Sequence, residues 1–111
     1  MAINTVTLRN TLVTAYKNTI VNSALYSTVP GATAGTEITG GSYARQPLTW
    51  GAVANSTVTS NAANFQVPAG ATVAGVGLLD SGGTYQDGVG VTSQPFSTAG
   101  VYTITVSYTQ T

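Results

Sequence analysis

The groups able to do chemistry in this sequence are six charged side chains, three acidic and three basic. They are Glu37, Asp80 and Asp87, and Arg9, Lys17 and Arg45. The chain has no histidine and no cysteine, which excludes catalytic triads built on either residue and zinc sites with the usual ligands. Asp80 and Asp87 could face each other across a hairpin as a glycosidase pair, whose members lie about 5–10 Å apart. Since both flank glycines, surface turns are the simpler interpretation, and we expect no enzyme.

Cofactor, metal and nucleic-acid sites are equally poorly supported. The segments 75–77 and 88–90 read Gly-Val-Gly, but they lack the third glycine and the following helix of a dinucleotide-binding motif. Close strand packing, or a bulge or turn, is the alternative meaning of these glycines. The loop between Asp80 and Asp87 lacks a recognised calcium-ligand spacing. Three dispersed basic residues, offset by three acids, form no basic patch for nucleic acid. We therefore expect neither cofactor nor nucleic-acid partner.

The composition favours association with other proteins. Charged residues make up 5% of the 111 residues and the formal net charge is zero, whereas about a quarter of an ordinary domain is charged. Net charge near zero promotes association. No apolar run approaches the about 20 residues of a membrane-spanning helix, so we expect no membrane partner. The first 20 residues lack the apolar core of a secretory signal, and we expect synthesis in a host cytoplasm.

The N-terminal region has the periodicity of a helix over about residues 5–18, with a strand as the competing interpretation. Asn4 or Thr5 would cap this helix. Arg9 and Lys17 fall on the side that we expect to face solvent. The residues expected on the buried side are Leu8, Leu12, Ala15 and Tyr16.

The remainder of the chain has the pattern of short strands separated by turns. Strands are expected at 20–28, around 48–50, at 64–67, at 72–79, within 84–94 with an interruption near Asp87, and over 101–109. In the last segment Tyr102, Ile104, Val106 and Tyr108 should face the core. Trp50 is also expected in the core. The fold class predicted is mainly β: one domain over 1–111, a β-sandwich or small jelly-roll-like barrel with one N-terminal helix.

One segment carries a family resemblance. Residues Glu37–Trp50 read EITGGSYARQPLTW and resemble a segment in small virion proteins of tailed bacteriophages, described as tail-fibre, minor tail or head decoration proteins. Residues 5–31, Val67–Gly77 and Phe96–Thr105 are similar to other parts of that family in the same order. Tyr26 stands where many members have histidine. The resemblance implies a structural protein of the virion.

Within that class, a self-contained domain of this size favours a capsid decoration protein that binds the outside of the assembled shell. Its partners would be the major capsid protein and neighbouring copies of itself. A tail or fibre component is the alternative, with a carbohydrate-binding adhesion module as a further one. The interface candidates are loop and N-terminal residues: Ala2, Ile3, Tyr43, Arg45, Gln46 and Tyr85. For Arg45, an internal pair with Glu37 competes with a partner contact.

Overall fold

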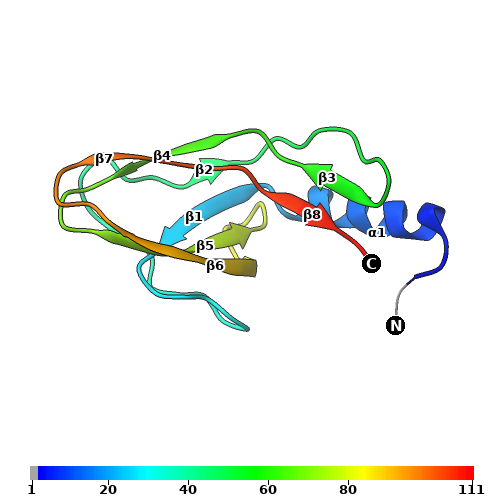
Figure 1. The fold of residues 1–111 in the computed structure, drawn as a ribbon, viewed down its shortest axis with the longest axis horizontal. Coiled ribbons are helices and arrows are strands. Elements are labelled where there is room, and N and C mark those ends of the chain that lie inside the picture. Colours follow the sequence, from blue (N-terminus) through cyan, green and yellow to red (C-terminus); the bar gives the residue numbers. More distant parts are fainter. Residues whose placement is uncertain (1–2) are drawn as a thin grey trace.

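A computed structural model describes residues 3–111 of the chain, and within this range it forms one helix and eight strands. The molecule is elongated, with extents of 47 × 25 × 24 Å (Figure 1). The elements are α1 (Val6–Thr19), β1 (Asn22–Tyr26), β2 (Gln46–Pro47), β3 (Thr57–Thr59), β4 (Ala63–Val67), β5 (Thr72–Leu79), β6 (Tyr85–Pro95), β7 (Gly100–Ile104) and β8 (Ser107–Thr109). The predicted mainly-β sandwich with one N-terminal helix is confirmed.

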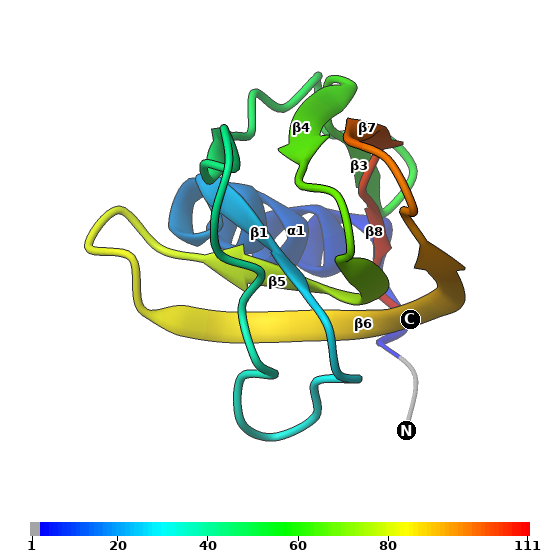
Figure 2. The same cartoon turned by 90° about the vertical axis from the view of Figure 1, so that its left-hand side faces the viewer.

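The strands form two layers. One layer is a four-stranded antiparallel sheet in the order β2-β1-β5-β6. The antiparallel pair β4–β7 lies across from it, and the pair β3–β8 continues toward the end where α1 lies (Figures 1 and 2). The outer edges of β6, β7 and β8 make no ladder in the described chain, so the sandwich is not closed into a barrel.

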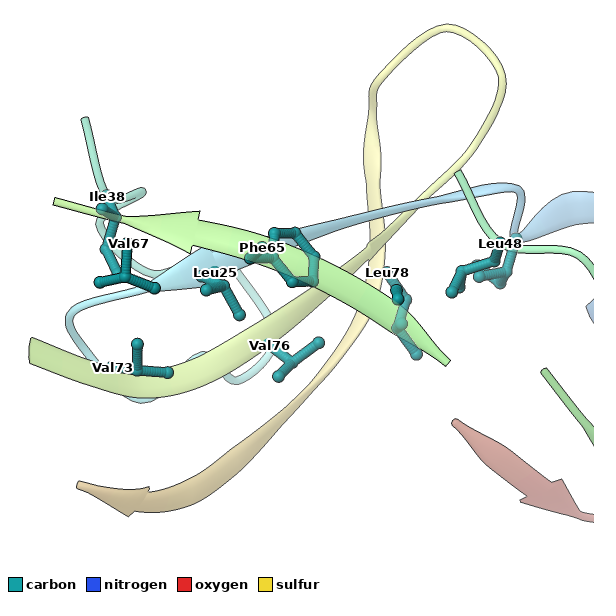
Figure 3. Close-up of a cluster of buried hydrophobic side chains, with 10 residues drawn as sticks. Leu25, Ile38, Leu48, Phe65, Val67, Val73, Val76 and Leu78 are labelled. Atoms are coloured by element: carbon teal, nitrogen blue, oxygen red, sulfur yellow. The ribbon is translucent and has the colours of Figure 1, made fainter. Parts of the chain in front are cut away.

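The main core lies between the two layers, where apolar side chains of β1, β4 and β5 meet (Figure 3). Alternation along β4 buries Ala63, Phe65 and Val67 and leaves the residues between them exposed, as the period of a strand requires. Phe65 and Leu25 have no exposed surface. β5 carries apolar residues on both faces, because a second cluster covers the outer side of its sheet. That cluster consists of Ala24, Tyr26 and Leu79, with Tyr85 against it.

The two Gly-Val-Gly segments are neighbours in the sheet. The pairing of β5 with β6 sets Gly75 opposite Gly90 and Gly77 opposite Gly88. A Cβ at Gly75 or Gly88 would lie closer than 3.0 Å to the ring of Pro30, from the loop after β1. These glycines therefore leave the outer face of the sheet flat enough for a loop to lie directly on it, and the close-packing interpretation is confirmed.

The helix agrees with its predicted position but not with its predicted orientation. Thr5 caps it, accepting a hydrogen bond from the Leu8 amide at 3.3 Å. Val13 is its one buried residue, whereas Leu8 and Leu12 are 49% and 39% exposed. The expectation that these leucines pack on the core is wrong. The side of the helix that faces the body carries Val13, Tyr16 packed against the core, and Arg9, which donates to the distant Ser56 hydroxyl.

Three strand predictions also change in detail. Residues 48–50 form no strand; Trp50 has a single bridge to Ser60 and donates its indole N–H to the Ile20 carbonyl at 2.6 Å. β6 runs through Asp87 without interruption, and the irregularity lies in its pairing with β5. The 101–109 strand divides into β7 and β8. Its predicted alternation holds, but the inward side chains of both are only half-buried.

Candidate interaction surface

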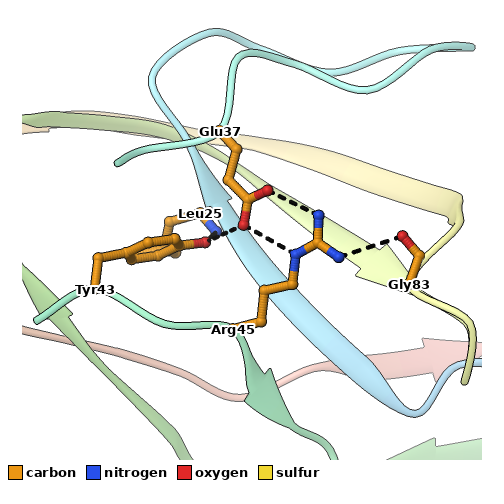
Figure 4. Close-up of polar contacts among 5 residues, drawn as sticks. All are labelled: Leu25, Glu37, Tyr43, Arg45 and Gly83. Atoms are coloured by element: carbon orange, nitrogen blue, oxygen red, sulfur yellow. Dashed lines mark hydrogen bonds and ion pairs between the residues drawn. The ribbon is translucent and has the colours of Figure 1, made fainter. Parts of the chain in front are cut away.

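The most distinctive sequence segment forms a polar cluster against β1 (Figure 4). Arg45 makes a bidentate pair with Glu37, with its Nη2 2.9 Å from Oε1 and its Nε 3.0 Å from Oε2. Its Nη1 also donates to the Gly83 carbonyl in the β5–β6 turn at 3.4 Å. The hydrogen bond from Arg45 lowers the pKa of Glu37. The internal pair expected between these two residues is therefore present, and it ties the 37–46 loop to the hairpin.

Tyr43 completes the cluster from the core side. Its hydroxyl accepts a hydrogen bond from the Leu25 amide at 3.0 Å and donates one to Glu37 Oε2 at 2.8 Å. Its ring lies against Phe65, with the centroids 6.2 Å apart. Burial raises the pKa of the Tyr43 hydroxyl above its ordinary value. The Tyr43 hydroxyl accepts the β1 amide hydrogen bond that the carbonyl of a neighbouring strand would otherwise accept. Tyr43 is half-buried, whereas we expected an exposed loop residue.

The remaining interface candidates lie in several places. Gln46 belongs to β2, where its carbonyl accepts from the Ser23 hydroxyl at 2.9 Å. Tyr85 begins β6 and donates to the Gly31 carbonyl at 2.8 Å. The Ile3 carbonyl accepts from Arg9, and Ala2 lies outside the described residues. The structure thus brings Tyr43, Arg45 and Gln46 together along the edge of β1 on which β2 pairs, and contact of any candidate with a partner stays a prediction.

The two aspartates considered as a catalytic pair have separate structural partners. Asp80 Oδ1 accepts from the amides of Gly82 and Thr84, both at 2.9 Å, which holds the hairpin turn. The Thr84 amide bond is the main cause of its lowered pKa. Asp87 Oδ2 instead accepts from the Tyr16 hydroxyl at 2.9 Å. Within residues 3–111 no three metal-ligating side chains are grouped.

Every charged side chain has a partner within the molecule, and all six lie in the described range. Arg9 donates its Nε to the Ser56 hydroxyl at 2.7 Å, and Lys17 donates to the Gly51 carbonyl at 3.3 Å. Arg45 is paired with Glu37, and the two aspartates are bonded as described above. The surface is accordingly poor in charge, and its exposed charged residues, Arg45 and Asp87, are already hydrogen-bonded within the molecule.

The structure reveals one surface that we did not predict, the outward side of the helix. We define the α1 outer face as five exposed residues: Leu8, Thr11, Leu12, Ala15 and Thr19. None of them is charged, because Arg9 and Lys17 both point toward the body. Nothing in the sequence signalled this orientation, because cations away from Leu8 are the ordinary pattern of a helix whose leucine side faces the core.

Two adjoining grooves lie beside α1, and the smaller one borders the α1 outer face. One, of about 370 Å³, is lined by Leu12, Ala15, Tyr16, Thr19, Ile20, Gln86, Asp87, Tyr108 and Gln110. The other, of about 410 Å³, runs between β6 and the β7–β8 segment over Val76, Leu78, Val89, Val91, Ile104 and Val106. The grooves meet at Tyr16, Asp87 and Tyr108. There the rings of Tyr16 and Tyr108 are stacked, with centroids 3.8 Å apart and planes within 4°.

The structure is that of a small, charge-poor β-sandwich domain. The family model of podophage GP4 fiber I protein gp80 matches residues 2–105, and the chain belongs to this family. It is therefore a bacteriophage structural protein and a component of the virion. The match supports the predicted relationship to phage structural proteins. No curated protein and no solved structure matches the chain.

Within residues 3–111, no helix has the length and apolar character needed to cross a membrane.

Proposed function

We propose that this chain is a fibre component of the phage particle and acts by holding other virion proteins through uncharged contacts. The observation that carries the proposal is the family match over residues 2–105, because the description of that family is a podophage fibre protein. The sequence favoured capsid decoration over a fibre. The family match supports a fibre at least as well, and we adopt it here.

The surface chemistry supports an adhesive role. Charged groups at an interface lose hydration, and this cost is recovered only with well-placed partners. Here only six of the 111 residues are charged, and each makes a hydrogen bond within the chain, so an interface would have few charged groups to bury. The exposed apolar side chains of α1 supply surface whose burial is favourable at roughly 25 cal/mol per Å². Contacts of this kind suit a permanent assembly.

The location in the particle is the decisive experiment. Antibodies against the purified chain would be applied to intact phage for immunogold microscopy, and its copies would be counted by mass spectrometry against the major shell protein. A fibre component labels the tail region and is present in far fewer copies than the shell protein. Labelling over the whole shell, in numbers near those of the shell subunits, would support decoration and overturn the fibre proposal. Absence from purified particles would overturn both.

A further inference from the structure

We propose that α1 is a hinged element that docks on the sandwich and releases from it as one unit, and that Ser56 is the residue that holds it in place. We call the hydrogen bonds that join Ser56 to Arg9 and Asn10 the Ser56 latch. The inference goes beyond the proposed function and does not depend on it, because it concerns a motion of the chain itself.

A single residue in the turn before β3 bonds the first half of α1 twice. Ser56 is 5% exposed. Its hydroxyl accepts from Arg9 Nε at 2.7 Å, and its amide donates to Asn10 Oδ1 at 2.8 Å. On the other side, the Ser56 carbonyl accepts from the Gln110 amide at 2.9 Å. Ser56 is therefore fixed to the C-terminal segment and presents its remaining polar groups to the helix.

The turn that carries Ser56 has a backbone shape that suits glycine. Ala54 and Thr57 exchange two backbone hydrogen bonds of 3.1 and 3.0 Å, and between them Asn55 and Ser56 have φ values of 50° and 65°. Two-residue turns of this kind favour asparagine followed by glycine, because both positions require a positive φ. Asn55 fits this preference, whereas Ser56 adopts a conformation that is uncommon for a residue with a Cβ. Unlike glycine, Ser56 has a hydroxyl for Arg9 to bind, so docking of the helix offsets the strain of the turn.

The stability of α1 depends on its contacts with the body. Six of its 14 residues are valine or threonine, and β-branched side chains are mediocre helix formers. A helix of this length is marginal by itself in water. Val13 is its one buried residue, and Tyr16 is half-buried with its ring stacked on Tyr108. So few buried contacts are typical of elements that open locally while the rest of the fold persists.

The two ends of α1 are held in different ways. At the C-terminal end Ile20 is 2% exposed, and its carbonyl accepts from the Trp50 indole at 2.6 Å. The next amide, that of Val21, donates to the Leu79 carbonyl in β5 at 3.0 Å. The first half of α1 is joined to the body by the Ser56 latch, at the end of the molecule where the N-terminus lies (Figure 1). Ile20 and Val21 are thus the hinge about which α1 moves when the latch opens.

Release of α1 would change the surface beside it. Tyr16 lines both grooves, and its hydroxyl donates to Asp87 at 2.9 Å. Movement about the hinge withdraws this ring from Tyr108 and removes the side chain at which the two grooves meet. The docked helix therefore acts as a lid over this side of the sandwich, and the Ser56 latch keeps the lid closed.

The first test is native-state hydrogen exchange of the purified chain, followed for each amide by NMR. The protection of residues 10–19 in α1 is divided by that of residues 73–79 in β5, because this ratio cancels changes in global stability. We expect α1 to be protected at least about tenfold less than β5. Equal protection of the two elements would mean that α1 opens only when the whole chain unfolds, and it would overturn the inference.

Ser56→Gly and Asn55→Gly form a matched pair of variants. Both place glycine at a positive φ of the same turn, but only Ser56→Gly removes the acceptor of Arg9. Ser56→Gly should lower the ratio of α1 to β5 protection by at least about fivefold, the effect of losing a hydrogen bond to a charged group. Asn55→Gly should leave the ratio unchanged. An equal fall in both variants, or an unchanged ratio in Ser56→Gly, contradicts the role given to Ser56.

A double-variant cycle tests the latch from the side of the helix. Arg9→Gln should lower the protection ratio in the wild-type chain and change it little in the Ser56→Gly chain, since both substitutions remove the same hydrogen bond. Equal effects in the two chains would show that Arg9 and Ser56 act separately, which overturns the latch. Circular dichroism follows each variant, and loss of the helix signal with the sheet signal retained counts as release of α1.

Discussion

The ring of Tyr26 in β1 lies over the Cα of Gly77 in β5, and this contact requires that Gly77 has no side chain. A Cβ at position 77 would lie closer than 3.0 Å to the hydroxyl oxygen, Cζ and Cε2 of Tyr26. Tyr26 is 3% exposed and belongs to the cluster that covers the outer face of the sheet. The contact therefore joins two central strands by filling a space that only glycine leaves open.

Gly77→Ala should lower the free energy of unfolding by about 1–3 kcal/mol, the usual cost of overpacking a well-filled site. The methyl group forces the buried ring of Tyr26 or the backbone of β1 to move. Urea denaturation followed by tryptophan fluorescence measures the change. The matched control is Gly31→Ala, because a Cβ at Gly31 would have no neighbour within 4 Å. The explanation fails if the two variants lose the same stability.

Tyr43→Phe should cost about 1–3 kcal/mol, the penalty for a buried donor left without an acceptor. The lost hydroxyl is the acceptor for the Leu25 amide, and Leu25 has no exposed surface. Tyr85→Phe is the control, since its hydroxyl donates to the exposed Gly31 carbonyl, which water can reach. Denaturation of the two variants and wild type, side by side, measures the difference. Equal losses in the two variants would contradict the role given to Tyr43.

The Glu37–Arg45 pair should make stability depend on acid pH. The pKa of Glu37 is lowered by Arg45, below the value of about 4.3 in an unfolded chain. The unfolded state thus binds protons first, so this stabilisation is present above the unfolded pKa and is lost as the pH falls through the folded pKa. Unfolding free energies measured from about pH 6 to about pH 3 should decrease less in Glu37→Gln than in wild type.

The Glu37→Gln variant should lose about 1 kcal/mol or less at neutral pH, because the pair is partly exposed. Part of the acid dependence should persist in it, since hydrogen bonds at the hairpin turn also lower the pKa of Asp80. The double variant with Asp80→Asn should therefore show the weakest dependence. An unchanged acid profile in Glu37→Gln would mean that the pair contributes nothing to folding.

Local patterns predicted the position of the elements well. The expected strand at 72–79 matches β5, and the helix expected at 5–18 is α1 within one residue at each end. Both depend on neighbouring residues: a capping Thr5 for the helix, and a continuous apolar run for the strand. The segment at 48–50 was not predictable in this way, since Trp50 is held by the distant Ile20 carbonyl and not by a ladder.

Less of the candidate surface than of the secondary structure could be predicted from the sequence. The leucine spacing in α1 identifies an apolar face, but spacing alone does not say whether this protein or another covers it. On the inward side, Arg9 bonds to Ser56, 47 positions away, and Val13 is buried. Similarly, the sequence alone identifies Tyr43 only as an aromatic residue in a loop. Its hydroxyl accepts a hydrogen bond from the Leu25 amide, and only the tertiary structure reveals this internal contact.

The sequence by itself determined that this is a charge-poor, mainly β protein, because composition and alternation are properties of neighbouring residues and of their sum. The tertiary structure alone decided that the charged side chains are all engaged internally and that the leucines of α1 face outward. Those outcomes depend on contacts between residues far apart in the chain. Hydrogen bonds and packing across these contacts, and not the local sequence pattern, determine which side of an element is buried.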